Sequence, residues 1–561
     1  METWAAVVLG AVVLIAFMVV SGRIRKRKML AALKAQWGKR GVQKQKLDED
    51  ALADIAQYWR EKQNAAPSPQ IIDDITWEDL SMDDLYRHIN QTQSTAGEEL
   101  LYAMLRDQSA SADELSARRR RTETMAAEPE MRLAVQWILR KQGKSRYRGA
   151  GTYLFRSELK RPNHEKLYYA LAAAPAAAAL SGIFAPVMFF AAGALILLNI
   201  VVNLKTQAVW NTQALAIKHV ASVLVTAKKI TKLGHPCLKE DIDSLKQSLA
   251  PLAGIHRWNM LFAMERANDF DFITDYLKMI FLIDMVSLCR ITANIIRHSA
   301  ELNAAYALVG EIDASIAVAN LKTAYPEYGT PEFHLAPDVY AEDIAHPLIE
   351  NPVVNSVSWT RNALITGSNA SGKSTFTKAL AINAIMAQSL NICRAKRFAM
   401  PRAHIMSSMA IRDSILRGES YFIAEIKSIK RILDAACDEC IILCFIDEIL
   451  RGTNTIERIA ASAALLKYMQ ALNLRCIAAT HDIELTRMLA PEYDNYHFAE
   501  RVTGAGMVFD YELKNGPSVS RNAIALLAQM QFPESATEDA QLLAARFDEK
   551  GIWERGEPFT A

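Results

Sequence analysis

The sequence predicts a multi-domain protein with transmembrane helices, an all-α middle part and a C-terminal α/β domain. Two apolar runs, residues 4–20 and 167–204, contain no charged residue. The segments between and after these runs show apolar residues at three-four spacing, which is typical of helices. Past residue 325 short β-type runs alternate with helices, which favours a largely parallel sheet.

The first predicted membrane span is the segment 1–22. Its apolar run is followed by the basic cluster GRIRKRK, whereas a cleaved signal peptide carries positive charge before its apolar stretch. The positive-inside rule therefore places the N-terminus outside and Arg23 onward in the cytoplasm. A cytoplasmic helical region is expected from 23 to 160.

A transmembrane hairpin is expected at 161–204. As one helix, residues 167–204 would measure roughly 57 Å, against a hydrocarbon core of about 30 Å. Ser181-Gly182 and Pro186 divide the run into two spans. Two crossings keep the C-terminal domain in the cytoplasm, which predicts a multi-pass protein of the cell (inner) membrane. The alternative is a buried Ala-rich hairpin in a soluble protein.

A second helical domain is expected from 205 to 335. Its run YLKMIFLIDMVSLC, residues 276–289, is apolar nearly all round, as expected for a helix in a bundle core. Upstream, residues 118–166 hold fourteen Lys/Arg against five Asp/Glu. Attraction to anionic lipid headgroups and contact with nucleic acid both explain this excess.

The net charge and the cysteine usage exclude few classes of protein. The formal net charge is +2, and the seven cysteines are scattered, as suits a reducing compartment. Cys437 and Cys440 have metal-ligand spacing, but no second pair follows them. The run continues into an apolar strand, so a core role is favoured.

The strongest motif begins where the strand-like run NALIT enters GSNASGKST, residues 367–375. It fits G-x-x-x-x-G-K-[ST] at every position, and such a loop wraps phosphate oxygens with backbone N–H groups at a helix N-terminus. Lys373 is predicted to reach the β- and γ-phosphates, and the Ser374 hydroxyl to bind Mg²⁺. The expected ATP-binding residues of this loop are Gly367, Ser368, Asn369, Ala370, Ser371, Gly372, Lys373, Ser374 and Thr375.

Two further strand ends complete a predicted catalytic set. In IILCFIDEIL, Asp447 is expected to hold Mg²⁺ together with Ser374, and Glu448 to deprotonate a water. The next strand, RCIAAT, precedes His481, which can hydrogen-bond a γ-phosphate or the attacking water. Glu448, His481 and Lys373 are the predicted catalytic residues of a Mg²⁺-dependent ATP hydrolase.

Between these motifs lies RGESYFIAEI, residues 417–426. Gly418 and Ser420 resemble the signature loop that ATP-binding-cassette-type ATPases present across a dimer to the partner's γ-phosphate. Ser420 is therefore added to the expected ATP contacts. Taken alone, the segment predicts a turn before a helix.

Together these residues resemble the MutS family of DNA mismatch repair ATPases. ITGSNASGKST is similar to the family phosphate loop, and ATHDIELT to its His switch. DEILRGTNT resembles the family's Asp-Glu motif except at Leu450, where Gly is usual. The resemblance implies a P-loop NTPase domain of ABC/MutS type at 336–561 with a helical tail. It also implies a homodimer through the ATPase domains, with 205–335 as the levers.

The departures from the family are specific. We expect no mismatch-reading domain, because no Phe-x-Glu stands in a suitable Gly-rich context. The predicted membrane hairpin interrupts the helical core where the family has a DNA clamp. VVNSVSW lacks the aromatic that the family stacks on adenine. Ala345 replaces the Arg of the family's Arg-His-Pro entry.

The expected function is a membrane-anchored MutS-like ATPase. It would bind and hydrolyse ATP as a dimer to drive a conformational clamp in DNA binding or mismatch-repair-type DNA metabolism. Duplex DNA, membrane lipids and an unidentified protein are the expected partners. The alternative is a membrane scaffold ATPase that gates protein partners without a DNA role. A transport motor is disfavoured, because the spans carry no charge to line a polar pathway.

Overall fold

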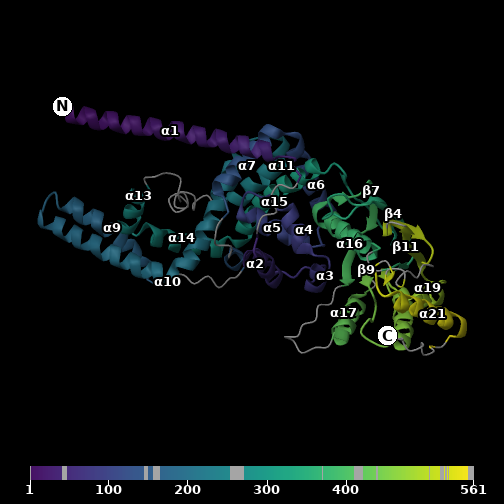
Figure 1. Ribbon diagram of the computed structural model, residues 1–561. Helices are drawn as coiled ribbons and strands as arrows, with labels where there is room; N and C mark the ends of the chain where they lie inside the picture. Colours follow the sequence, from purple (N-terminus) through teal and green to yellow (C-terminus); the bar gives the residue numbers. More distant parts are fainter. Residues whose placement is uncertain are drawn as a thin grey trace. The chain divides into compact units, whose positions relative to one another are not determined.

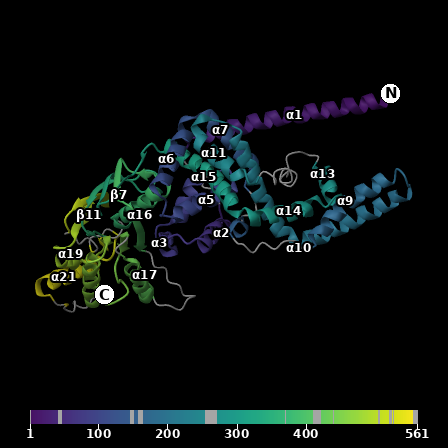
Figure 2. The ribbon, with the colours of Figure 1, turned by 180° about the vertical axis from the view of Figure 1, so that it is seen from behind.

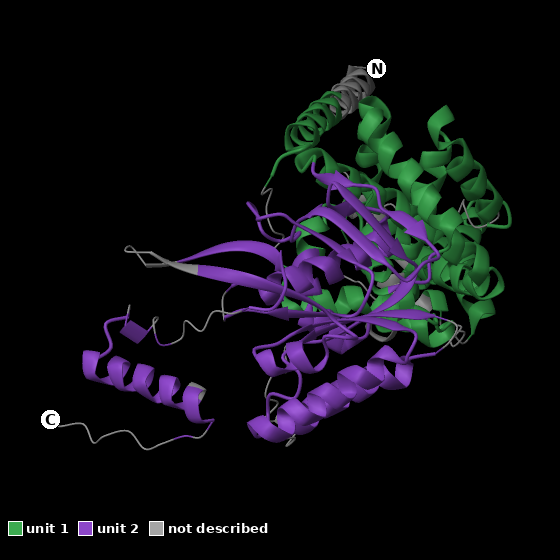
Figure 3. Ribbon diagram, turned by 90° about the vertical axis from the view of Figure 1, so that its right-hand side faces the viewer, with its two compact units in different colours: residues 1–69, 86–106, 111–326 green, residues 70–85, 107–110, 327–561 purple. Residues whose placement is uncertain are grey.

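The computed structural model describes residues 2–40, 47–144, 150–155, 164–252, 271–368, 371–409, 421–437, 440–503, 506–518, 524, 527–528, 530–551 and 553. They form two compact units (Figure 3). The first unit comprises 1–69, 86–106 and 111–326, and the second comprises 70–85, 107–110 and 327–561. The described part of the first unit is helical, and every described strand belongs to the second unit.

The helices of the first unit follow one another along the chain (Figure 1). They are α1 (Glu2–Gln36), α2 (Glu49–Ala65), α4 (Met82–Ile89, whose first residues belong to the second unit), α5 (Thr95–Arg106), α6 (Ala112–Ala127), α7 (Pro129–Gln142), α8 (Ala150–Phe155), α9 (Glu165–Ser181), α10 (Val187–Thr231), the short 3₁₀ helix η1 (Pro236–Leu238), α11 (Lys239–Leu249), α13 (Asp271–Ile280), α14 (Ile283–Arg297) and α15 (Ser299–Ala324).

The centre of this unit is α15, which is buried along most of its length and packs against α5 and α6. Two glycines allow the close approach of α5 and α15. A Cβ on Gly97 would lie 2.3 Å from Asp313 Oδ2, and one on Gly310 would lie 2.6 Å from the Ala96 carbonyl oxygen. The buried Asp313 carboxylate accepts hydrogen bonds from Ser94 N (2.8 Å) and Ser94 Oγ (2.6 Å). It thereby ties the N-terminus of α5 to α15.

Helix α9 and the first half of α10 form an antiparallel hairpin beside which α13 and α14 lie (Figures 1 and 2). Among the described residues two stretches are long and apolar enough to cross a membrane, Val187–Thr206 and Ser299–Ala324. The second is 72% buried and is the core helix α15, whereas the first is 17% buried. The first predicted span lies in α1, where the side chains of residues 2–16 are outside the described part.

The apolar run 276–289 does not form the single core helix that its composition predicts. Helix α13 ends at Ile280 and α14 begins at Ile283. Between them Leu282 has φ +46°, in the left-handed region that interrupts helices. Both helices contact the hairpin, and α14 is also buried from Met285 to Cys289 and contacts α15, as expected for a core helix.

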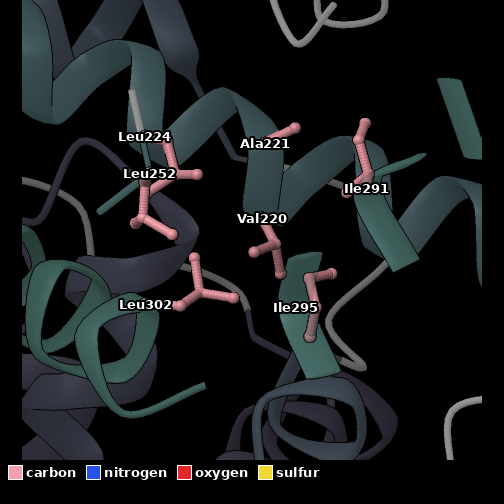
Figure 4. A pocket seen from close by; sticks show the side chains of 7 residues that line it. All are labelled: Val220, Ala221, Leu224, Leu252, Ile291, Ile295 and Leu302. Carbon is pink, nitrogen blue, oxygen red and sulfur yellow. The ribbon is translucent and has the colours of Figure 1, made fainter. Parts of the chain in front are cut away.

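A small apolar pocket lies within the first unit (Figure 4). Its lining comes mainly from α10 and α14, with one leucine from α15. The lining residues are Val220, Ala221, Leu224, Leu252, Ile291, Ile295 and Leu302. Because these side chains are all aliphatic, the pocket offers no polar group that could orient a ligand.

The second unit is built on a six-stranded sheet with the order β12-β11-β5-β10-β9-β8. All neighbours are parallel except β11 and β12, which form an antiparallel hairpin. A four-stranded sheet has the order β2-β7-β3-β4, and β1 pairs with β6. The strands are β1 (Tyr328–Gly329), β2 (Glu332–His334), β3 (Val339–Ile344), β4 (Asn355–Trp359), β5 (Ala363–Thr366), β6 (Cys393–Arg394), β7 (Arg397–Pro401), β8 (Ala403–Ser408), β9 (Ile441–Asp447), β10 (Leu474–Ala479), β11 (Asp494–Thr503) and β12 (Gly506–Asn515).

Helices cover both faces of the six-stranded sheet, which explains why its central strands are apolar at successive positions. Ile442, Cys444 and Ile446 of β9 belong to a core shared with α17 and α18, while α16 also contacts β9. The helices of this unit are α3 (Asp74–Asp79), α16 (Lys373–Leu390), α17 (Tyr421–Ala435), α18 (Thr455–Gln470), α19 (Ile483–Met488) and α21 (Glu534–Lys550).

Two short upstream segments, 70–85 and 107–110, belong to the second unit. Asp79 accepts hydrogen bonds from Ser407 Oγ (2.8 Å) and Met409 N (2.9 Å) at the end of β8. His404 Nε2 donates to the Ile71 carbonyl oxygen at 2.9 Å. The second unit, which contains the ATPase domain predicted at 336–561, thus includes residues that precede position 336 by more than two hundred positions.

Candidate nucleotide site

The phosphate-binding loop follows β5, whose residues Ala363–Thr366 are all buried. Gly367 has φ +145° and Gly372 has φ +110°. A Cβ on Gly367 would lie 2.8 Å from the Phe498 carbonyl oxygen, so both the backbone angle and the space require glycine there. Helix α16 starts at Lys373, directly after the loop. The geometry is the strand, loop and helix that the motif predicts.

The placement of the predicted loop residues varies. Asn369 and Ala370 lie outside the described residues, as does Ser420 in the signature segment. Ser371 and Lys373 are buried, whereas Thr375 is exposed.

Lys373 is 4% exposed, and its ammonium group closes the loop. Its Nζ donates to the carbonyl oxygens of Gly367 (2.7 Å) and Ser368 (2.8 Å). Burial lowers the pKa of Lys373, while nearby Asp447 and Glu448 oppose that shift. The lysine is therefore already positioned inside the loop.

Asp447 ends β9, and Ser374 lies in the first turn of α16. The structure brings the two side chains into hydrogen-bond contact; burial raises the pKa of Asp447, and the Ser374 hydrogen bond opposes this. A carboxylate and a hydroxyl are the hard oxygen ligands that Mg²⁺ prefers, with water and phosphate oxygens completing the shell. This pair therefore fits the predicted metal position. No cluster of three or more His, Cys, Asp or Glu side chains suited to a metal occurs among the residues that the structure describes.

Two side chains, His481 and Arg451, contact the carboxylate of Glu448. His481 Nε2 donates to its carboxylate at 3.1 Å, and Arg451 Nη1 donates at 2.7 Å. The hydrogen bond from His481, followed by that from Arg451, lowers the pKa of Glu448 to about 2, against an ordinary value of 4.5. The backbone of Glu448 has φ +58°, and its N–H donates to the Ala479 carbonyl oxygen at 2.9 Å. The unusual backbone angle turns the side chain toward His481 at the end of the neighbouring strand.

The turn after Glu448 also explains the departure at Leu450. This residue has φ +56°, a conformation that glycine adopts without steric cost. Leu450 is 4% exposed and belongs to the core shared with α17 and α18. Burial of the leucine side chain offsets the cost of the left-handed backbone.

Glu425 of α17 is a site residue to which the sequence assigned no role. It is 3% exposed, and its carboxylate accepts hydrogen bonds from Arg451 N (3.0 Å) and Gly452 N (3.4 Å). A Cβ on Gly452 would lie 3.0 Å from Phe422 Cβ, so α17 and the loop 448–454 are in close contact. These contacts join α17, the signature helix whose first residues belong to the segment 417–426, to the loop 448–454. The only sequence signal was a glutamate inside an otherwise apolar helix face.

Tyr511 of β12 is a second site residue to which the sequence assigned no role. Its Cδ1 lies 3.2 Å from the position of a Cβ on Gly372, and its ring is 5.9 Å from that of Phe509. The Tyr511 backbone has φ +56°, and its carbonyl oxygen accepts a hydrogen bond from Asn355 Nδ2 at 3.0 Å. An aromatic side chain therefore lies beside the loop, although VVNSVSW supplies none.

The arginine run 118–121, by contrast, is engaged inside the first unit. Arg121 pairs with Asp241 (2.8 Å) and Glu311 (2.6 Å), and Arg120 pairs with Glu240 at 2.8 Å. Arg119 pairs with Glu123 one turn away. These carboxylates neutralise part of the charge that suggested lipid or nucleic-acid contact.

The fold and the loop define the second unit as a P-loop nucleotide-binding domain. The family model of MutS domain V matches residues 363–548. Similar proteins include the DNA mismatch repair proteins MutS of Natronomonas pharaonis, 30% identical over 246 residues, and of Thermus aquaticus, 28% identical over 252 residues. These matches cover 42% and 44% of this chain but 28% and 30% of the relatives. The human MutS protein homolog 4 is 30% identical over 274 residues, 47% of this chain and 27% of that protein.

The chain thus contains a MutS-type domain V at residues 363–548. It spans less than a third of the length of these relatives. The matched region contains the phosphate loop, Asp447, Glu448 and His481.

Proposed function

We propose that this protein is a membrane-anchored, Mg²⁺-dependent ATPase that works as a dimer and serves a MutS-like role in DNA mismatch-repair-type metabolism. The observation that carries the proposal is the convergence of Glu448 and His481 at neighbouring strand ends, beside a phosphate loop closed by Lys373. That arrangement is suited to hydrolysis as well as to binding.

In the proposed mechanism, Lys373 exchanges its two loop carbonyl partners for the β- and γ-phosphates of ATP. Ser374 and Asp447 would hold the magnesium ion, which supplies charge neutralisation on the phosphates when bound. Glu448 accepts the proton of the attacking water, and His481 orients that water or the γ-phosphate.

A carboxylate with a pKa near 2 is a weak base at neutral pH. Loss of the Arg451 contact raises the pKa of Glu448 and makes it a stronger base. We therefore assign the observed Arg451–Glu448 pair to a resting state, which ATP binding and dimer closure would open.

The surface near the signature helix supports dimerisation through this domain. Ile423 and Ile426 of α17 are 45% and 39% exposed, and Ile456 at the start of α18 is 82% exposed. Exposed aliphatic side chains on adjoining elements suit burial against a second copy of the chain. Tyr511 would supply an aromatic face for the nucleotide base.

Membrane anchoring is supported by the hairpin surface. Large apolar side chains of α9, α10 and their connection are open to solvent, with Phe184 91% and Phe190 83% exposed. The apolar stretch Val187–Thr206, whose single charge is Lys205 near its end, measures about 30 Å as a helix, the thickness of a hydrocarbon core. We propose a cell (inner) membrane location with the ATPase domain in the cytoplasm.

The first test is ATP hydrolysis by the detergent-solubilised protein, with Lys373→Ala as the control, with and without matched and mismatched duplexes. DNA-dependent turnover with steep salt dependence supports the repair-type role. Turnover that does not depend on DNA supports the second candidate, a membrane scaffold ATPase that gates protein partners. The hairpin favours that candidate because it stands where the family has a DNA clamp. Absence of turnover, or turnover unchanged in Lys373→Ala, would refute the ATPase proposal.

A further inference from the structure

Asn199 of α10 is a fully buried asparagine that joins three helices of the hairpin region. Its Nδ2 donates to the Leu171 carbonyl oxygen of α9 at 2.9 Å. The same Nδ2 donates to the Ile280 carbonyl oxygen, at the end of α13, at 2.8 Å. One side-chain amide thus connects α9, α10 and α13.

Both carbonyl groups lack an ordinary helical partner. The Leu171 carbonyl would accept from the N–H of residue 175, but that residue is Pro175, which has none. Ile280 is the last residue of α13, and carbonyls of a last turn have no intrahelical donor. In a membrane an unsatisfied backbone group is costly, because no water replaces the missing donor. Asn199 therefore satisfies two backbone groups that the fold leaves open.

These hydrogen bonds also fix the position of the α13–α14 elbow, residues 276–283, relative to the length of the hairpin. The charges nearest to the open end of the hairpin are Lys166 and Lys205, and no charged residue lies between them. Leu171 and Asn199 are five and six residues further in, about 8–9 Å along the helices. Interfacial elements lie about 5–10 Å into the boundary of headgroups and acyl chains. The elbow lies at that depth if the hairpin is inserted up to its two lysines.

The composition of the elbow and the exposure of its first two residues match such a position. Met279–Ile283 carry no charge and are flanked by Lys278 and Asp284. Tyr276 and Leu277 in the last turns of α13 are 62% and 46% exposed. An amphipathic aromatic ring at the level of the headgroups is a common membrane-interface anchor.

We propose that the α13–α14 elbow, residues 276–283, is a membrane-interfacial element fastened to the hairpin by Asn199, and that its partner is the lipid headgroup–acyl boundary. The inference rests on the proposed membrane anchoring and adds a lipid contact from a segment whose sequence predicts a soluble bundle core. It also implies that α14 starts from the membrane surface.

The first experiment uses the full chain in phosphatidylcholine–phosphatidylglycerol vesicles that contain a diazirine-bearing phosphatidylcholine. After photolysis, lipid-modified peptides are mapped by mass spectrometry. We expect modification of peptides from 180–204 and from 276–283, and none from β5–α16 of the nucleotide domain. A modified hairpin with an unmodified elbow overturns this inference and leaves membrane anchoring intact. If neither segment is modified, membrane anchoring itself fails.

The role of Asn199 is tested by hydrogen exchange in the same vesicles. Asn199→Leu should speed amide exchange about fivefold both in α9 around Pro175 and in the elbow, as expected for the loss of hydrogen bonds. Asn203→Leu is the matched control, because Asn203 is equally buried one turn away and both its side-chain polar atoms lack a hydrogen bond among the described residues.

Pro175→Ala provides a second, independent test of the role of Asn199. It restores an N–H for the Leu171 carbonyl but not for Ile280. In the Asn199→Leu background it should therefore recover slow exchange in α9 and leave the elbow fast. Equal effects of the Asn199 and Asn203 variants, or recovery of both segments by Pro175→Ala, would show that Asn199 does not fasten the elbow.

Discussion

Replacement of Glu425 by alanine tests whether the signature helix and the loop after Glu448 act as one part. The carboxylate accepts a 3.0 Å hydrogen bond from Arg451 N and a longer one, 3.4 Å, from Gly452 N. A hydrogen bond to a buried charged group contributes about 1.5–3 kcal/mol, and the longer bond adds less. Alanine leaves both N–H groups without their acceptor, so we expect a loss of roughly 3 kcal/mol in the free energy of unfolding.

For a domain of this size the loss corresponds to a fall in Tm of roughly 6–12 °C. It also frees the loop that carries Arg451, so kcat for ATP should fall about tenfold, equivalent to 1.4 kcal/mol of transition-state stabilisation. The KM for ATP should change little, because the Glu425 hydrogen bonds go to the loop 448–454 and not to the phosphate loop. Thermal unfolding followed by intrinsic fluorescence and steady-state ATP turnover measure the two effects.

Glu425→Gln is the matched control. It keeps one acceptor oxygen at the same place and loses the charge, so the fall in Tm should be about half as large. The reasoning is refuted if Glu425→Ala retains the Tm and kcat of the parent protein. An equal loss in both variants would mean that charge, and not the two hydrogen bonds, decides the effect.

Further predictions concern the phosphate loop, the catalytic carboxylate and the aromatic neighbour. Lys373→Ala should abolish measurable ATP binding by equilibrium dialysis; binding within threefold of the parent, roughly the effect of a minor contact, would contradict the assigned role. Glu448→Gln should still bind ATP but hydrolyse it about 10²-fold more slowly, and unchanged turnover would place the base elsewhere. Because the pKa of Glu448 is lowered from 4.5 to about 2, its pairing stabilises the fold above pH 4.5 and is lost as the pH falls toward 2; acid unfolding of Glu448→Gln should be flatter in that window. Tyr511→Ala should weaken ATP binding about fivefold while Tyr511→Phe stays near the parent, and equal loss in both variants would point to the hydroxyl instead of the ring.

Several features follow from local sequence because local chemistry dictates them. The phosphate loop needs glycine where φ is +145° and +110°, so its motif specifies a strand, loop and helix without reference to the rest of the chain. Asp447 and Glu448 follow an apolar run that can only be a buried strand. Such signals lie within a few residues of one another, and a single sequence reveals them.

Other features depend on residues that are distant along the chain. Which carboxylate would accept hydrogen bonds from the backbone of the loop 448–454 could not be predicted from spacing, because Glu425 and Arg451 are brought together by packing of α17 on the sheet. The run 276–289 has the composition of a core helix, yet Leu282 interrupts it and the pieces lie on the hairpin. The arginines at 118–121 form a basic cluster in sequence, but carboxylates more than a hundred residues away pair with Arg120 and Arg121.

By itself the sequence determined the class of nucleotide site, the positions of its loop and acidic residues, and the apolar runs that form the hairpin. These features depend on backbone geometry, residue chemistry and short-range periodicity, and residues close together in the sequence specify all three. Only the tertiary structure decided that Glu448 is held ionised between His481 and Arg451, that Glu425 joins the signature helix to the loop, and that Asn199 completes the hydrogen bonds that Pro175 and the end of α13 leave open. Each of these contacts joins residues from different elements, and their meeting is set by how the elements pack.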